Sequence, residues 1–268
     1  MKYWEIIPWY IQAIPNIAIQ LQSMVFEEVL KKFEANQQMF AVLIDPDKYD
    51  ENSLLDLSEV AGKGGVNFFL VGGSLMTSDR LDQTIQILKS TSNIPIIIFP
   101  GSNLQVNSKA DALLFLSLIS GRNPEFLIGQ HVVAAPYVKK SGLETIPTGY
   151  MLIEGERQTT ANYMSNTFPI PRNKAEIAVC TAMAGEMLGL KVIYMDGGSG
   201  ALGTIPGEMI KKVKSNISIP LIVGGGITTA KQAHYIWESG ADLIVVGNAI
   251  EGNLELIGQI SSALKTAV

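Results

Sequence analysis

The chain contains a single cysteine, Cys180, among its 268 residues. An intrachain disulfide is therefore impossible, and a metal site built from several cysteines is excluded. Cys180 lies in an apolar, helix-like stretch, which favours the role of a small core residue. The low cysteine content fits the reducing cytoplasm, where we expect this protein to work.

Long runs of lysine or arginine are also absent, and the formal net charge is -5. A nucleic-acid-binding surface and a basic membrane-binding patch both need clustered positive charge. We therefore expect no nucleic-acid partner and no stable membrane insertion. A small molecule is the expected partner.

Histidine is scarce, with His131 and His234 as the only two. His234 lies in a helical pattern remote from predicted strand ends, which favours a structural role, and the role of His131 is open. The sequence contains neither a Ser-His-Asp arrangement nor a pair of histidines at metal-ligand spacing. These two kinds of site are therefore not indicated.

Residues 1–23 differ in character from the rest of the chain. They are rich in Trp, Tyr and Ile, and are interrupted by Pro8 and Pro15. The segment has one cation and no small-residue cleavage site, so we do not expect a signal peptide, and its prolines disfavour a membrane span. We interpret it as an atypical apolar N-terminal extension before a single domain over residues 24–268. An apolar flap or interface element is the alternative.

From residue 41 onward, short apolar runs alternate with amphipathic stretches, as is typical of βαβ units. The predicted strands are Ala41–Asp45, Asn67–Gly72, Pro95–Phe99, Ala112–Leu118, Thr148–Ile153, Val192–Asp196, Pro220–Gly224 and Leu243–Gly247. The predicted helices are Ser53–Ala61, Ser78–Ser90, Lys174–Leu188, Gly207–Val213, Thr229–Ser239 and Leu254–Leu264, and an amphipathic segment, Val25–Phe33, precedes the first strand.

Strands separated by crossover helices predict an α/β fold, a closed (β/α)8 TIM barrel with a helical N-terminal extension. An open doubly wound sheet is the alternative, disfavoured because no Gly-x-Gly-x-x-Gly follows the first strand. Two regions, 120–147 and 154–171, are less regular. The second is a long polar loop that we interpret as either a lid or a surface insertion.

Glycine-rich turns follow the last two predicted strands, at Gly225-Gly226 and at Gly247-Asn248. Glycine lets a ligand approach the backbone closely, and a following helix N-terminus attracts an anion. Each turn alone is equally well explained as a tight connection between strand and helix. Because the loops after strands seven and eight of such barrels commonly bind phosphate, the pair predicts a phosphate site.

Other predicted strand ends carry polar groups. Asp45 and Asp47 follow the first strand and offer the hard oxygen ligands that Mg²⁺ prefers, or else Asp45 caps a loop and Asp47 faces solvent. After the sixth strand, Asp196 can hold a polyol while Ser199 and Gly200 contact its phosphate. The alternative for that segment is a glycine-rich turn with Tyr194 in the barrel wall.

Six ordered motifs lie at or near predicted strand ends: Leu43-Ile44-Asp45-Pro46-Asp47-Lys48, Val71-Gly72-Gly73-Ser74, Ile98-Phe99-Pro100-Gly101-Ser102, Tyr194-Met195-Asp196-Gly197-Gly198-Ser199-Gly200-Ala201, Gly224-Gly225-Gly226-Ile227 and Val246-Gly247-Asn248. Together they resemble the geranylgeranylglyceryl phosphate synthase family, over a match from about Met24 to the end of the chain. The resemblance implies a magnesium-dependent alkyl transferase of ether phospholipid biosynthesis. It would move a geranylgeranyl group from geranylgeranyl diphosphate to the 3-hydroxyl of sn-glycerol 1-phosphate.

The resemblance also implies the site residues. Asp45 and Ser74 match the magnesium positions, and Asp45, Asp196 and Tyr194 are the expected catalytic residues. The expected glycerol-phosphate positions are Tyr194, Met195, Asp196, Gly197, Gly198, Ser199, Gly200, Gly225, Gly226, Gly247 and Asn248. Candidate residues for lining the prenyl groove are Leu75, Phe99, Pro100, Phe115 and Leu116, with ordinary barrel core as the alternative.

Two departures from the family pattern are visible. Asp196 occupies a position where many relatives carry the longer Glu, and Ile44 stands just before Asp45 where some relatives carry Lys. The second departure indicates the larger, archaeal and bacterial group of the family. That group implies a C20 donor and a homodimer or a hexamer of dimers.

Two other classes of function stay open at this point. One is another phosphate-binding barrel enzyme, such as a sugar- or indole-phosphate isomerase or synthase, which should need a second general acid or base at a strand end. The other is a non-catalytic barrel that binds a phospholigand without magnesium-dependent turnover.

Overall fold

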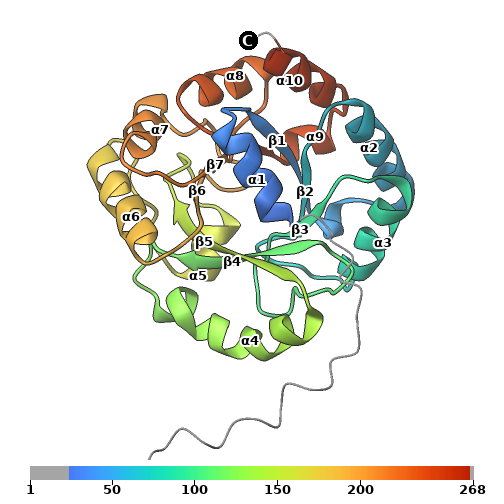
Figure 1. The fold of residues 1–268 in the computed structure, drawn as a ribbon, viewed down its shortest axis with the longest axis horizontal. Coiled ribbons are helices and arrows are strands. Elements are labelled where there is room, and N and C mark those ends of the chain that lie inside the picture. The colour runs from blue at the N-terminus through green and yellow to red at the C-terminus, as the bar shows by residue number, and fades with distance from the viewer. Residues whose placement is uncertain (1–23, 266–268) are drawn as a thin grey trace, which may run out of the picture.

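The computed structural model describes residues 24–265, and its eight parallel strands form a closed barrel in which each strand pairs with its neighbours in chain order. Figure 1 shows this barrel from one end, with the helices arranged around it. Pairing of β1 with β8, for example Ala41 with Val245, closes the ring. The strands are β1 (Met39–Ile44), β2 (Phe68–Val71), β3 (Ile96–Ile98), β4 (Ala112–Leu118), β5 (Glu144–Leu152), β6 (Val192–Asp196), β7 (Leu221–Gly224) and β8 (Leu243–Val246).

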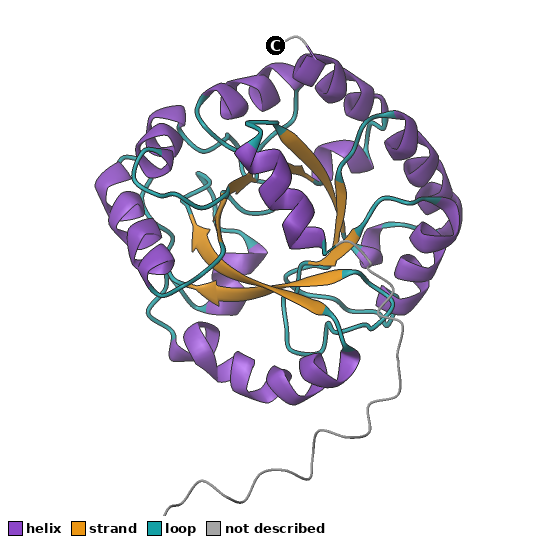
Figure 2. Cartoon of the chain, in the orientation of Figure 1, coloured by secondary structure: helices purple, strands orange, loops and turns teal. Residues whose placement is uncertain are grey.

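Helices form the outer layer around the strands of the barrel (Figure 2). Helix α2 begins at a recognisable cap: it starts after Asp50, whose carboxylate accepts from the Ser53 N–H at 2.8 Å. The helical elements are α1 (Val25–Glu34), η1 (Pro46–Lys48), α2 (Glu51–Lys63), α3 (Leu81–Thr91), η2 (Glu125–Gly129), α4 (Gln130–Ser141), α5 (Thr160–Ser165), α6 (Ala175–Met187), α7 (Gly207–Lys214), α8 (Ala230–Glu238), α9 (Asn248–Glu251) and α10 (Glu255–Lys265).

Alternating side chains of each strand build two separate apolar layers. Phe40, Val42 and Ile44 of β1 point outward and pack against the helices, as do the matching residues of the other strands. The inward side chains fill the barrel itself and are Met39, Ala41, Phe68, Leu70, Ile97, Ala112, Leu114, Ile146, Val192, Tyr194, Ile222, Leu243 and Val245. The barrel is therefore a packed core rather than a pore.

Helix α1 closes the N-terminal end of the barrel. Val25 and Val29 join the inner apolar layer, and Figure 1 shows the helix lying across the centre of the ring. Its first turn is fixed by Glu144 at the start of β5, whose carboxylate accepts from the N–H groups of Val25 and Phe26 at 2.6 and 3.1 Å. With this end plugged, the C-terminal end is the one open to a ligand.

The predicted closed barrel is confirmed, and so are all eight predicted strands to within a few residues at their ends. One long helix was missed: α4 lies in the region 120–147 that we read as irregular. It contains Pro136 and has exposed Val132 and Val133, so it lacks a clear amphipathic pattern.

The predicted N-terminal extension, residues 1–23, lies outside the described residues. Within residues 24–265, no helix has the length and apolarity needed to cross a membrane.

Candidate active site

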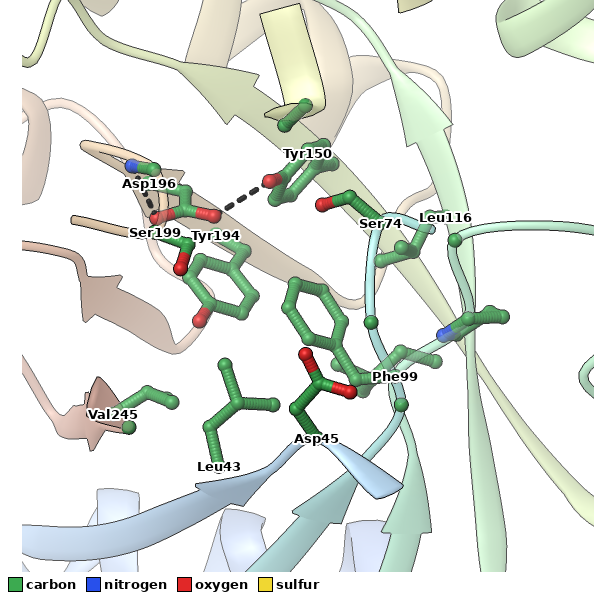
Figure 3. Close-up of a pocket in the computed structure, with 18 of the residues that line it drawn as sticks. Leu43, Asp45, Ser74, Phe99, Leu116, Tyr150, Tyr194, Asp196, Ser199 and Val245 are labelled. Carbon is green, nitrogen blue, oxygen red and sulfur yellow. Dashed lines mark hydrogen bonds between the residues drawn. The ribbon is translucent and has the colours of Figure 1, made fainter. Parts of the chain in front are cut away.

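A cavity of about 250 Å³ opens at the C-terminal ends of the strands. Its lining comes from the loops after most of the strands, with polar groups on the β1, β2 and β6–β8 side and apolar groups from β4 and α4. This is the end of a (β/α)8 barrel where active sites occur. Figure 3 shows the labelled side chains arranged around this cavity.

Two carboxylates of the site, half-buried Asp45 and buried Asp196, continue the inward-facing rows of β1 and β6. In β1 the inward positions are Met39, Ala41 and Leu43, and Asp45 follows directly after the strand. In β6 they are Val192, Tyr194 and Asp196. Strand alternation therefore directs both carboxylates toward the cavity, where Figure 3 shows them.

Three aromatic rings support the site from below. Phe99 stacks on Tyr194 with ring centroids 5.1 Å apart, and Tyr150 meets both rings edge-on at 5.8 and 5.5 Å. Stacked and edge-on pairs hold their rings in defined positions. Tyr194 is 1% exposed and thus belongs to the wall of the cavity. Burial and the nearby Asp196 charge raise the pKa of Tyr194 well above its ordinary value, so its hydroxyl stays protonated.

Asp196 is 8% exposed and makes two close hydrogen bonds. The Tyr150 hydroxyl donates to Asp196 Oδ2 at 2.6 Å, and the Gly198 N–H donates to Oδ1 at 2.7 Å (Figure 3). Burial raises the pKa of Asp196, and the two hydrogen bonds act in the opposite direction. A carboxylate held in place with a raised pKa is suited to accept a proton.

Asp45 and Ser74 line the cavity on the opposite side. A Cβ on Gly73 would lie 3.3 Å from the Asp45 carboxylate, so the loop that carries Ser74 passes directly over Asp45. Burial raises the pKa of Asp45, and the Asp47 N–H and the more distant Lys48 only partly offset this. A cation beside this carboxylate would therefore stabilise its charged form.

The Ser74 loop is fixed by two polar side chains. Buried Gln105 donates to the Gly73 carbonyl at 2.9 Å and accepts from the Gly101 N–H at 3.0 Å. Asp47 accepts from the N–H of Thr77 at 2.6 Å and from the hydroxyls of Thr77 and Ser78. Asp47 thus joins the β1 and β2 loops through its own exposed hydrogen bonds, while Asp45 caps η1, as the alternative reading of this motif expected.

The glycine loops after β6 and β7 pack backbone against backbone. Gly225 and Gly226 have φ of +87° and +71°, and a Cβ on Gly225 would lie 2.8 Å from the nitrogens of Gly197 and Gly198. Only glycine meets both conditions. Together with the loop after β8, these two loops form a glycine-lined cup. Ser199 donates to Asn248 Oδ1 at 3.1 Å across it, which joins the β6 loop to α9.

The other end of the cavity is apolar and extends between β4 and α4. His131 lies in this wall, with its ring 4.5 Å from Phe115 and edge-on to it. Burial lowers the pKa of His131, which favours the neutral imidazole. The lining here is Leu113, Leu114, Phe115, Leu116, Leu118, Phe126, Ala134 and Val138.

The predicted loop 154–171 contributes to the cavity wall through Ala161, Met164 and Ser165. It contains the short helix α5 and is tied to the β6 loop, where the Leu202 N–H donates to the Gly155 carbonyl at 3.1 Å. The segment therefore borders the site, as the lid interpretation requires.

The cavity brings together most of the predicted site residues. Those that line it are Asp45, Ser74, Tyr194, Asp196, Gly198, Ser199, Gly200, Gly225, Gly226, Gly247 and Asn248. Met195 points into the outer apolar layer, and Gly197 uses its N–H to pair with the Gly224 carbonyl, so neither offers a side chain to the cavity. Of the prenyl candidates, Leu75 is absent from the lining and is 52% exposed, whereas Phe99, Pro100, Phe115 and Leu116 line it.

Sequence reasoning missed Tyr150, Gln105 and Lys48. The inward position of Tyr150 on β5 is the one signal that alternation offered, because the predicted strand contained it. Gln105 belongs to a loop without a motif, and the Asp45 motif that contains Lys48 does not by itself indicate a role for the lysine. Their roles depend on contacts across the barrel that the sequence does not display.

Comparisons with known proteins agree with this site. A family model, described as the PcrB family, matches residues 32–265. The geranylgeranylglyceryl phosphate synthase of Chitinophaga pinensis is 50% identical over 92% of this chain and 98% of its own, and that of Spirosoma linguale is 48% identical over 86% and 93%. A crystal structure of (S)-3-O-geranylgeranylglyceryl phosphate synthase from Thermoplasma acidophilum, in complex with its substrate sn-glycerol-1-phosphate, has a TM-score of 0.86 and 32% identity. It covers 91% of this chain and 99% of that one.

Proposed function

Because the chain belongs to the PcrB family, we propose that it is a prenyltransferase that joins a geranylgeranyl group to sn-glycerol 1-phosphate. The observation that carries this proposal is the pairing of a glycine-lined cup and a buried carboxylate with a long apolar extension in one cavity. Such a cavity suits one small polar phosphate ester and one large apolar partner. The products would be 3-O-(geranylgeranyl)glyceryl phosphate and diphosphate.

The acceptor would bind in the cup formed by the loops after β6, β7 and β8. Gly225 and Gly226 let its phosphate approach the backbone, and Ser199 and Asn248 offer polar side chains at the same place. The glycerol hydroxyls then lie on the side of Asp196. The solved complex of the Thermoplasma enzyme with sn-glycerol-1-phosphate supports glycerol phosphate as a ligand of this barrel.

The donor would lay its chain along the apolar end of the cavity, between Phe99 and the α4 wall. Burial of apolar chain contributes roughly 0.8 kcal/mol per methylene, so a C20 tail contributes on the order of ten kcal/mol before ordering costs. The diphosphate end of the donor then faces Asp45 and Ser74.

We propose Mg²⁺ as the cofactor, with Asp45 and Ser74 as its protein ligands. Magnesium is commonly held by one or two carboxylates together with substrate phosphates. No cluster of three or more His, Cys, Asp or Glu fit for a metal occurs in residues 24–265, which agrees with a site that substrate completes. When bound, the ion would neutralise the charge that develops on the leaving diphosphate.

The protein groups supply positioning and the proton acceptor. The acceptor oxygen attacks C1 of the donor, the C1–O bond to diphosphate breaks, and the hydroxyl proton passes to the Asp196 carboxylate. Tyr150 and the Gly198 N–H hold that carboxylate toward the acceptor. The apolar wall and the segment 154–171 keep water from competing for the reactive carbon.

We further propose a cytoplasmic homo-oligomer, a homodimer or a hexamer of dimers. The exposed apolar side chains of α4, Val132, Val133 and Tyr137, support an assembly surface. Light scattering on the purified protein would give the mass of the assembly directly.

The proposed reaction is tested by incubating the protein with Mg²⁺, labelled sn-glycerol 1-phosphate and prenyl diphosphates of ten to thirty-five carbons. We expect a labelled ether lipid with the C20 donor, and its loss when EDTA removes the metal. Absence of product from every donor, with glycerol phosphate still bound, would favour a non-catalytic barrel.

A further inference from the structure

The charge balance of the cavity is unfavourable for its proposed ligands. Its described lining contains the carboxylates Asp45, Asp196 and Glu251, and Lys48 is the one lysine or arginine in it. Arg157 approaches Gly200 from the segment 154–171 but lies outside the lining. Two substrates that carry phosphate groups would therefore bind in a cavity lined, among residues 24–265, by only one positively charged lysine or arginine side chain, Lys48.

Lys48 lies where the two phosphate-binding sides of the cavity meet. It ends η1, three residues after Asp45, and its side chain crosses from the β1 loop to α9. The Nζ atom is 4.0 Å from Asp45 Oδ2, 3.4 Å from Asn248 Oδ1 and 2.9 Å from Glu251 Oε1. Asp45 belongs to the proposed magnesium side, and Asn248 to the glycerol-phosphate side.

We infer that Lys48 is a binding residue for phosphate oxygens of both substrates, and that Glu251 holds its ammonium at the boundary between the two subsites. This inference rests on the proposed function. In the free protein Glu251 is the closest partner of the ammonium, at 2.9 Å. The ammonium carries three donors, so it can keep Glu251 and still donate to a phosphate on each side. Lys48 would thereby fix the separation of the acceptor phosphate and the leaving diphosphate.

Binding measurements test this role without relying on turnover. Isothermal titration calorimetry would compare Lys48→Met with the wild type, using sn-glycerol 1-phosphate alone in one arm and inorganic diphosphate with Mg²⁺ in the other. Methionine keeps the apolar stem and removes the ammonium. Since a hydrogen bond to a charged group contributes about 1.5 to 3 kcal/mol, we expect each Kd to rise by roughly 10- to 150-fold. Lys48→Arg, which keeps the charge, should recover part of the affinity for both ligands.

Lys63→Met is the matched control, because Lys63 pairs with Glu59 at 2.6 Å on exposed α2 and loses the same charge away from the cavity. Its two Kd values should equal those of the wild type. The inference is overturned if Lys48→Met, folded with an unchanged Tm, changes neither Kd by more than about twofold. A higher Kd for only one of the two ligands would overturn the inference that Lys48 binds both. If the wild type binds both ligands but forms no ether lipid, the proposed function fails while the Lys48 result still stands.

Discussion

The side chain of Asp196 meets two requirements of a general base: it is held in a fixed position, and its pKa is raised. Its hydrogen bonds from Tyr150 and Gly198 fix both carboxylate oxygens, while its burial raises its pKa. At this single residue, the features that would serve catalysis also work against stability, because a buried charge is costly.

Replacement of Asp196 by Asn should remove the proton acceptor and keep the shape of the side chain. We expect kcat to fall by about 10²- to 10⁴-fold, the usual contribution of general acid-base catalysis. Asp196→Glu, which keeps a carboxylate, should retain more activity than Asp196→Asn. Steady-state rates of ether formation measure the effect, and a wild-type rate for Asp196→Asn would exclude Asp196 as the base.

The same substitution should change the dependence of stability on pH. Because the pKa of Asp196 is raised in the folded protein, its burial is without penalty below the unfolded pKa and destabilises the fold as pH rises through the folded pKa. Asp196→Asn should therefore match the wild-type Tm in acid and exceed it at neutral pH. A difference in Tm that is constant across pH would contradict this account.

Loss of the Asp45 carboxylate should abolish turnover and leave the fold intact. The side chain caps only the short η1 turn, so Asp45→Ala removes few structural contacts. We expect activity with Mg²⁺ to fall by at least about 100-fold, as when a group that stabilises developing charge is removed. Asp56→Ala, which removes an exposed carboxylate from α2, is the control. A near wild-type rate for Asp45→Ala would contradict the metal assignment.

Residues that follow a strand in the inward register could be predicted from sequence, because alternation continues past the strand end. Asp45 is of this kind, and Asp196 is the last inward residue of β6 itself. The contact of Lys48 with Glu251 and that of Gln105 with Gly73 could not be predicted, because each joins loops that only barrel closure brings together. For Asp47 the residue type suggested a ligand, while its partners Thr77 and Ser78 come from another loop.

At the scale of whole elements, the loops after β6 and β7 act as one unit. Their backbones touch at Gly225, whose left-handed conformation directs the chain past Gly197 and Gly198. A methyl group at Gly225 would have to push these nitrogens away, and the cup would widen where the acceptor phosphate is proposed to bind.

Gly225→Ala should therefore raise KM for sn-glycerol 1-phosphate by more than about tenfold, since one lost charge-assisted contact accounts for that much. Gly142→Ala is the matched control, because Gly142 has φ of +73° at the end of α4 and no atom within 4 Å of its added Cβ. Both variants should lose about 1 to 2 kcal/mol of stability from the left-handed backbone. An unchanged KM in Gly225→Ala would argue against the cup.

Strands and helices with a clear hydrophobic pattern could be predicted from the sequence, and those without one could not. The eight strands are apolar and punctuated by glycine or proline, so they were found. Helix α4 was not, because Pro136 and its exposed valines hide the helical period, and α9 is one turn long. The missed α4 is also the element that completes the apolar end of the cavity, which explains why only part of that lining was foreseen.

In the molecule as a whole, the two ends of the barrel have different tasks. Helix α1 and Glu144 close the N-terminal end, while the cavity occupies the C-terminal end. Changes at the closed end should affect stability and leave the chemistry alone.

Glu144→Ala should lower the free energy of unfolding by about 0.5 to 2 kcal/mol, the usual cost of losing a side chain that caps a helix. The N–H groups of Val25 and Phe26 would lose their partner, and α1 would pack less firmly on the barrel. Urea unfolding gives the free energy, and kcat/KM for ether formation should stay within about twofold of the wild type. A large loss of kcat/KM in a folded variant would show that the two ends are coupled.

The central claim, transfer of a prenyl group to one specific glycerol phosphate, is tested most directly by the stereochemistry of the acceptor. The measurement is kcat/KM of the wild type with geranylgeranyl diphosphate and Mg²⁺, once with sn-glycerol 1-phosphate and once with sn-glycerol 3-phosphate. The account predicts a preference for the 1-phosphate of at least about 100-fold, because a site built to hydrogen-bond one arrangement of hydroxyls rejects the other. Equal values for the two acceptors, or an ether product from neither, would contradict it.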